Sequence, residues 1–257
     1  MRYFFHIAYQ GTIYSGWQKH PNTNTVQQVL ETKLSQVLKV PVLINGCGRT
    51  DAGVHASQFF FHADLDIVDK EELLFRLNKA LPADIAVFDI IEMEGKPHAR
   101  FDAYSRTYDY LIHTYKNPFL STSSSFYHLK NFNPKQVEKA LQLLLLYQDY
   151  RGFCTTPAKY EHTICRISAV GLYVDESGKH LRLQVSANRF LSKMIRIMVG
   201  KLLKIGSGTM SIDEFEHHLI SKETPVILDL AYPQGLHLSK VTYPFLDLPN
   251  AAECFGL

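Results

Sequence analysis

An acidic side chain stands in the middle of a glycine-rich stretch, Gly46-Cys47-Gly48-Arg49-Thr50-Asp51-Ala52-Gly53-Val54-His55-Ala56. A loop of this kind can present one side chain rigidly, so Asp51 is a candidate functional acid. The residue types alone leave a second interpretation open, because an Asp beside a Gly often caps its own turn. Asp51 and His55 would also fit a hydrolase, although their four-residue spacing in a glycine loop gives that hypothesis little support.

The sequence offers no support for metal or disulfide chemistry. The four cysteines contain no CxxC pair, which argues against a zinc knuckle and against a disulfide framework. The 12 histidines include no HxxxH pair and no Cys/His cluster. We therefore expect a protein without a bound metal that works in a reducing cytosol.

The composition is that of a folded protein rather than a disordered or membrane protein. The 257 residues are 46% hydrophobic and 12% aromatic, which provides enough apolar material for a sizeable core. Since Lys and Arg number 27 and Asp and Glu 25, a nucleic-acid surface would have to come from local clustering of charge. His6 and Gln10 interrupt the N-terminus before a signal-peptide core could form, and no apolar run approaches membrane-spanning length. We expect a soluble, cytoplasmic protein.

The elements that position the Asp51 loop are predicted from periodicity and capping signals. Thr25 and Asp69 are candidate N-caps, because each is followed three residues later by Gln or Glu. The pattern predicts helices over residues 25–39 and 69–80, and strands over residues 3–8, 40–44, 58–64 and 85–91. The Asp51 loop then connects two strands of a β-α-β-β-α-β unit, the ferredoxin-like arrangement.

The second half of the chain is predicted to repeat this order. Asn133 with Pro134 and Ser211 with Glu214 mark helix starts. The predicted strands cover residues 107–113, 167–174, 181–187 and 236–243, and the predicted helices cover residues 133–147 and 190–205, with a shorter helix after residue 211. We expect an α+β protein with ferredoxin-like halves at residues 1–103 and 104–257. The halves would share one continuous, mostly antiparallel sheet, with helices on one face and a cleft between them for a ligand.

The Asp51 loop resembles the signature of the tRNA pseudouridine synthase A family through its run Gly-Arg-Thr-Asp-Ala-Gly-Val-His. Similar motifs occur in family order along nearly the whole chain. They include Tyr9-Gln10-Gly11-Thr12, Ser15-Gly16-Trp17-Gln18, Thr25-Val26-Gln27, His98-Ala99-Arg100-Phe101, Ser105-Arg106-Thr107-Tyr108, Met194-Ile195-Arg196 and Val241-Thr242-Tyr243. The resemblance implies the pseudouridine synthase fold and an enzyme that isomerises uridine in the anticodon stem-loop of tRNA, at positions 38–40. It also implies a homodimer and no cofactor.

The same resemblance assigns roles to four residues. Asp51 is the implied catalytic residue, and Arg49 is the implied contact to RNA near the flipped base. Tyr108 is implied to stack on the uracil, although the strand pattern alone favours a core tyrosine. Arg196, from the other half, is the implied cation that keeps the carboxylate ionised. Whether Asp51 attacks the sugar, attacks the base or removes a ribose proton stays open, because all three routes begin from the same carboxylate.

The helix predicted over residues 190–205 also has a charge pattern of its own. At 100° per residue, one side is apolar, and a basic side carries Arg189, Lys193, Arg196, Lys201 and Lys204. This stripe would suit an RNA backbone and give a salt-sensitive affinity. A merely solvated helix face fits the same pattern.

A few positions depart from the family pattern. Arg189 stands where a glycine is common, Cys47 stands where alanine is typical, and the loop after Ala56 is one residue short. Because Asp51, Tyr108 and the arginines are intact, these changes concern the choice of target rather than the reaction. A divergent relative that modifies another uridine stays an alternative, as does an RNA-binding protein or chaperone that keeps the fold without turnover.

Overall fold

The computed structural model describes residues 1–67, 69–223 and 229–249 and shows an α+β fold with mostly antiparallel strand pairing. The chain divides into two compact units, one formed by Met1–Tyr104 with residues 237–249, the other by Ser105–Leu236. A division after residue 103 places the final strand in the second half. In the structure that strand belongs to the first unit, because His237 and Leu238 pair in parallel with His55 and Ala56. None of the helices in the described part of the chain has the length and apolarity needed to cross a membrane.

The first unit has the predicted β-α-β-β-α-β order. Its elements are β1 (Arg2–Tyr9), α1 (Val26–Leu38), β2 (Asn45–Gly46), β3 (His55–Asp64), α2 (Lys70–Ala80) and β4 (Ile85–Met93), joined by β9 (Leu236–Thr242). β1 lies between β4 and β3, and all three are antiparallel, while β2 pairs antiparallel and β9 parallel with β3. β1 and β2 therefore run parallel with β3 inserted between them, which is the split βαβ arrangement.

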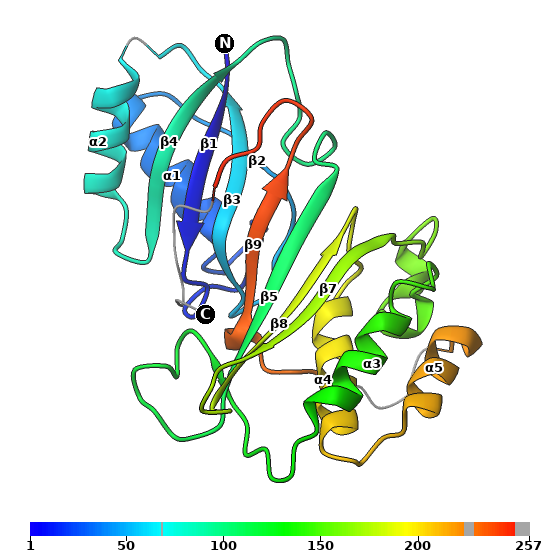
Figure 1. The fold of residues 1–257 in the computed structure, drawn as a ribbon. Helices are drawn as coiled ribbons and strands as arrows, with labels where there is room; N and C mark the ends of the chain where they lie inside the picture. Colours follow the sequence, from blue (N-terminus) through cyan, green and yellow to red (C-terminus); the bar gives the residue numbers. More distant parts are fainter. Residues whose placement is uncertain (68, 224–228, 250–257) are drawn as a thin grey trace. The chain divides into compact units, whose positions relative to one another are not determined.

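Aromatic residues fill both faces of this sheet, because side chains alternate along each strand. On one face Phe5 stacks on Phe61 with ring centroids 4.6 Å apart. On the opposite face Tyr243 meets Phe4 and Phe60 edge to face. Apart from its last residue, β3 is buried along its whole length. Helices α1 and α2 lie together on one side of the sheet (Figure 1).

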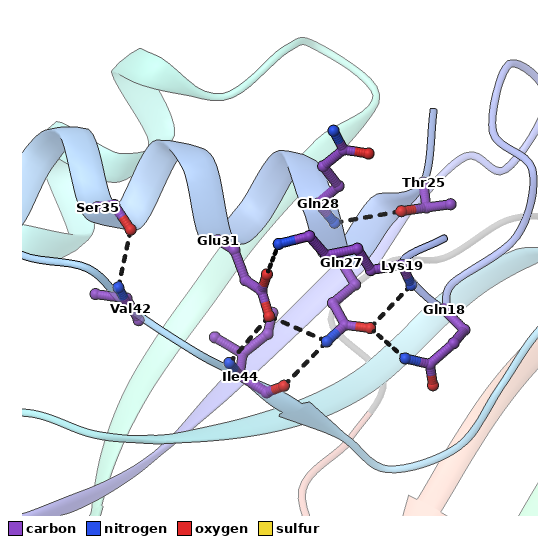
Figure 2. A network of polar contacts seen from close by, with 9 residues as sticks. All are labelled: Gln18, Lys19, Thr25, Gln27, Gln28, Glu31, Ser35, Val42 and Ile44. Carbon is purple, nitrogen blue, oxygen red and sulfur yellow. Dashed lines mark hydrogen bonds and ion pairs between the residues drawn. The ribbon is translucent and has the colours of Figure 1, made fainter. Parts of the chain in front are cut away.

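The predicted strand over residues 40–44 is wrong: residues 41–44 are irregular, and β2 covers only Asn45–Gly46. Its backbone groups bond instead to side chains one turn apart on α1 (Figure 2). The Val42 N–H donates to Ser35 Oγ (2.9 Å), the Ile44 N–H donates to Glu31 Oε1 (3.3 Å), and the Ile44 carbonyl accepts from Gln27 Nε2 (3.2 Å). A segment that satisfies its backbone on a helix has no need of a strand partner.

In the second unit the strands pair antiparallel in the order β5-β8-β7. Its elements are β5 (Ser105–His113), β6 (Ser125–Phe126), α3 (Pro134–Leu143), β7 (Ile167–Val174), β8 (His180–Ala187), α4 (Met194–Gly206) and α5 (Ile212–Ser221). The predicted hairpin is confirmed as β7 and β8, which are joined through Gly178 at φ 66°. α3 packs against β7, α4 and α5 (Figure 1).

The helix starts follow the capping residues with one exception. Thr25, Asp69, Asn133 and Ser211 each accept a hydrogen bond from a backbone N–H three residues later. The long helix of the second unit begins at Met194 rather than at residue 190, because Lys193 adopts a left-handed backbone (φ 59°) that cannot continue a right-handed helix. α3 ends at Leu143, four residues before the predicted end.

Candidate active site

The Asp51 loop connects β2 to β3 and turns immediately after the acid. Asp51 is half-buried, between the buried Thr50 and the exposed Ala52. The Val54 N–H donates to the Asp51 carbonyl (3.2 Å), and Gly53 supplies the positive φ (75°) that this turn requires. The carboxylate therefore stands on a short backbone turn rather than on a long mobile loop.

The segment that follows β1 braces this turn on its inner side. The Tyr9 hydroxyl and Thr50 Oγ1 lie 2.9 Å apart in the buried interior. The Gly53 N–H donates to the Tyr14 carbonyl, and the Trp17 N–H donates to the Thr50 carbonyl, both at 3.2 Å. Two backbone bonds from this segment, with one side-chain bond from the end of β1, thus hold the residues on both sides of Asp51.

Two glycines allow this close approach. A Cβ on Gly11 would lie 1.9 Å from the Val54 carbonyl oxygen, and one on Gly16 would lie 2.4 Å from the Thr50 carbonyl oxygen. Gly16 also has φ 90°, which side-chain-bearing residues rarely adopt. Both glycines occur in the motifs that resemble the family, but their role as the floor of the Asp51 loop emerges only from these distances.

His55 is part of this support. The side chain is 1% exposed, its Nδ1 accepts the Gly11 N–H at 3.1 Å, and its ring stacks on His237 with centroids 4.6 Å apart. A histidine that accepts a backbone N–H through Nδ1 is fixed in orientation. These contacts favour a structural role for His55 over a hydrolytic pair with Asp51.

Arg49 lies on the same loop, and its side chain is exposed. Its Nε donates to Gln18 Oε1 at 3.1 Å. In the part of the chain that the structure describes, Arg49 makes no ion pair with a carboxylate. The contact is to a neutral amide, which holds the side chain without neutralising its charge.

Tyr108 and Arg196 lie in the second unit, on β5 and α4. Tyr108 is half-buried, and its ring meets Phe190 edge to face with centroids 5.2 Å apart. The fully buried tyrosine of this strand is Tyr110, whose hydroxyl donates to the Tyr232 carbonyl at 2.9 Å. Of these two tyrosines on one strand face, Tyr110 is the core residue.

The half-buried Arg196 is tied to the segment that precedes β9. Its Nε donates to the Ala231 carbonyl (2.8 Å), and the Ala231 N–H donates to the Arg196 carbonyl (3.0 Å). Burial raises the pKa of the nearby Tyr110 and Tyr127, and the positive charge of Arg196 opposes this rise at both hydroxyls. No motif in the sequence pointed to Ala231 as the partner of Arg196.

The predicted basic stripe along this helix is wrong as a continuous surface. Lys201 is buried, with Nζ 3.0 Å from His218 Nδ1 and over the ring of Phe153. Lys204 forms an ion pair with Asp229. A helix in contact with neighbours on more than one side hides positions that a two-sided pattern assigns to solvent. α4 packs against both α3 and the turn Arg151–Phe153.

Within the described residues, no group of three or more His, Cys, Asp or Glu side chains is placed to hold a metal ion. The candidate residues thus fall into two sets: Arg49 and Asp51 on one loop of the first unit, and Tyr108 and Arg196 on two elements of the second.

Comparison with known proteins agrees with the loop motif. A family model described as tRNA pseudouridine synthase matches residues 6–102 and 140–244. A tRNA pseudouridine synthase A from Porphyromonas gingivalis is 37% identical over 248 residues, covering 95% of this chain and 97% of the relative. Proteins of the same name from Bacteroides fragilis and Shewanella pealeana are 35% and 33% identical, each covering 95% of this chain, and 96% and 94% of the relatives. The chain belongs to the tRNA pseudouridine synthase family.

Proposed function

We propose that this protein isomerises uridine to pseudouridine in tRNA, with Asp51 as the catalytic residue. The observation that carries the proposal is the placement of Asp51 on a turn that Tyr9, Tyr14 and Trp17 hold from one side. A carboxylate whose backbone is fixed before substrate arrives loses little freedom in reaching the reactive geometry.

The reaction requires a positioned carboxylate, and it consumes no second substrate. The bond between C1′ of the ribose and N1 of the uracil breaks, and a bond between C1′ and C5 forms. N1 takes up one proton, and C5 releases one, so no atoms or electrons are gained overall. No redox partner is required, and the chemistry fits an acidic side chain acting on one face of the nucleotide.

Three other residues complete the proposed site. A uridine in a stem must leave its stack at a cost of about a few kcal/mol, which stacking in the pocket offsets. We assign this stacking to Tyr108, whose half-buried ring lies against Phe190. We assign to Arg196 the positive charge that stabilises the Asp51 carboxylate. Arg49 contacts the RNA beside the flipped base.

The family implies further features of this enzyme. We propose that two ferredoxin-like halves frame the site in one sheet, and that the substrate is the anticodon stem-loop. We also propose that two copies of the chain dock one tRNA as a homodimer. We further propose that the enzyme acts in the cytoplasm. Light scattering of the purified protein, alone and with tRNA, tests the dimer, and mapping the modified uridines tests the target.

The decisive experiment uses unmodified tRNA that carries 5-tritiated uridine. The wild-type protein should release tritium as C5 loses its proton, and Asp51→Asn should release none, because a neutral amide supplies no charge. Asp51→Asn should still bind tRNA with an affinity that falls as salt is added. Equal release by both proteins would end the assignment of Asp51, and no release from any tRNA would favour a binding protein on the same fold.

A further inference from the structure

A polar network joins α1 to the segment that precedes it, and one of its members, Glu31, is buried (Figure 2). It is formed by Gln27 and Glu31, one helical turn apart, with Gln18 and Lys19 from the segment before the helix. Glu31 is 5% exposed on the same helix as the core residues Leu30 and Leu34. A charged residue in such a position has to be paired and hydrogen-bonded, since a buried carboxylate without partners is costly.

The partners of Glu31 leave it little freedom. Oε2 accepts from Lys19 Nζ at 2.8 Å, and Oε1 accepts from Gln27 Nε2 at 3.0 Å and from the Ile44 N–H at 3.3 Å. The carboxylate thus holds the Ile44 backbone, five residues before Arg49, as well as the Gln27 side chain.

These contacts determine which way the Gln27 amide faces. Its Nε2 donates to Glu31 and to the Ile44 carbonyl (3.2 Å), so both amide protons are used. Oε1 consequently points to the other side, where it accepts from Gln18 Nε2 (2.8 Å) and from the Lys19 N–H (3.0 Å). If the Gln27 amide were flipped, its oxygen would face the two acceptor oxygens of Glu31 and Ile44. Its NH2 group would face the two donors of Gln18 and Lys19, so all four hydrogen bonds would be lost.

The Gln18 amide is oriented in the same manner. Because its Nε2 donates to Gln27, its Oε1 faces Arg49 and accepts from Nε at 3.1 Å. The order Glu31, Gln27, Gln18, Arg49 is therefore a directional relay, in which each side chain sets the orientation of the next. The last contact of this relay, from Arg49 Nε to Gln18 Oε1, fixes the side of the exposed guanidinium that carries Nε.

We infer that Gln18, Gln27 and Glu31 are positioning residues that orient Arg49 toward the RNA; this inference rests on the proposed function. Among the residues that the structure describes, Gln18 is the hydrogen-bond partner of the Arg49 side chain. The Nη1 and Nη2 groups stay available for bidentate contact with an RNA phosphate or carbonyl oxygen, the geometry in which arginine binds oxyanions best. The relay lowers the freedom that Arg49 loses on binding RNA.

The test is a double-mutant cycle between Gln27 and Arg49 in the full-length protein, with unmodified tRNA transcript as the ligand. Gln27→Ala should raise both the tRNA Kd and the KM for tritium release about tenfold, with kcat within about twofold. In the Arg49→Ala background the same change should cost less than about twofold, because there is no guanidinium left to orient. Gln28→Ala is the matched control, since Gln28 is exposed on the adjacent helix position, and it should leave Kd unchanged.

Equal losses from Gln27→Ala with and without Arg49 would overturn the inference, as would an equal loss from Gln28→Ala. Gln18→Ala repeats the cycle without uncovering the buried carboxylate, so it decides the question if Gln27→Ala unfolds the protein. The two proposals fail separately. A wild type that releases no tritium refutes the enzyme, whereas the cycle in Kd still tests the relay; an active wild type with an additive cycle refutes only the relay.

Discussion

Replacing Gly11 by alanine tests whether the segment after β1 fixes the Asp51 turn. The φ of Gly11 lies outside the left-handed region, so alanine adds no backbone strain there, but its Cβ would lie 1.9 Å from the Val54 carbonyl oxygen. The Cβ is attached directly to the buried backbone of residue 11, and the Val54 carbonyl is itself buried backbone. Neither group can rotate away from the other. The clash must be relieved by moving Val54 and the turn that carries Asp51.

The size of the effect follows from that distance. Ordinary contact between a Cβ and an oxygen begins near 3.4 Å, so the two chain segments have to separate by about 1.5 Å, and a shift of about 1 Å in a reacting group can cost about a hundredfold in rate. Inserting a methyl group into packed structure also costs about 1–3 kcal/mol of stability. The Gly11 N–H is displaced as well, which weakens its bond to His55 Nδ1. We expect kcat to fall about a hundredfold with little change in tRNA affinity.

The assay is single-turnover tritium release at saturating enzyme, together with tRNA binding and thermal unfolding of the same preparations. Gly48→Ala is the matched control, because Gly48 lies in the same loop and a Cβ there would meet nothing within 4 Å. It should keep kcat within about twofold of the wild type. A folded Gly11→Ala protein with wild-type kcat would refute the bracing argument, and so would a Gly48→Ala protein that loses as much rate.

Two further predictions concern stability. Burial, with help from the nearby Arg2 charge, lowers the pKa of His62 from 6.5 to about 4, and its Nδ1 accepts the Ala99 N–H at 3.0 Å. Because the unfolded chain binds the proton more tightly, the free energy of unfolding should fall as pH drops from 6.5 to 4, by on the order of 2 kcal/mol; His62→Asn should flatten this part of the urea-denaturation profile, and an unchanged slope would contradict the assignment. Burial also lowers the pKa of Lys201, with Lys204 adding to the effect, so the cost of its charge is present at neutral pH and disappears as pH rises toward 10.5. Lys201→Met keeps the contact with Phe153 and should raise the unfolding midpoint at pH 7 by about 2–4 °C, whereas a lower midpoint would show that the ammonium stabilises the fold.

Local signals in the sequence predicted the helix starts well. Thr25, Asp69, Asn133 and Ser211 cap their helices as expected, because each cap bonds to a backbone group only three residues away. The hairpin of β7 and β8 and the α+β class followed from periodicity for the same reason. The Asp51 motif could also be recognised from the sequence, since its residues are consecutive.

Features that depend on distant partners could not be predicted in this way. Residues 40–44 have a strand pattern, but side chains of α1 take their backbone bonds. Lys201 has the helical position of a solvated charge, but it is buried beside Phe153 and His218. The final strand joins the first unit, because its partner β3 lies about 180 residues earlier in the chain.

The sequence by itself determined the helix caps, the hairpin, the family and the identity of the candidate acid, because each of these is written in residues close together along the chain. Only the tertiary structure decided what holds Asp51 and Arg49 in place. Their supports, the Gly11 and Gly16 contacts and the relay from Glu31 through Gln18, join segments that are adjacent in space and separated in sequence. Hydrogen bonds and steric contacts act over a few ångströms, so a pattern along the chain does not reveal which distant groups will meet.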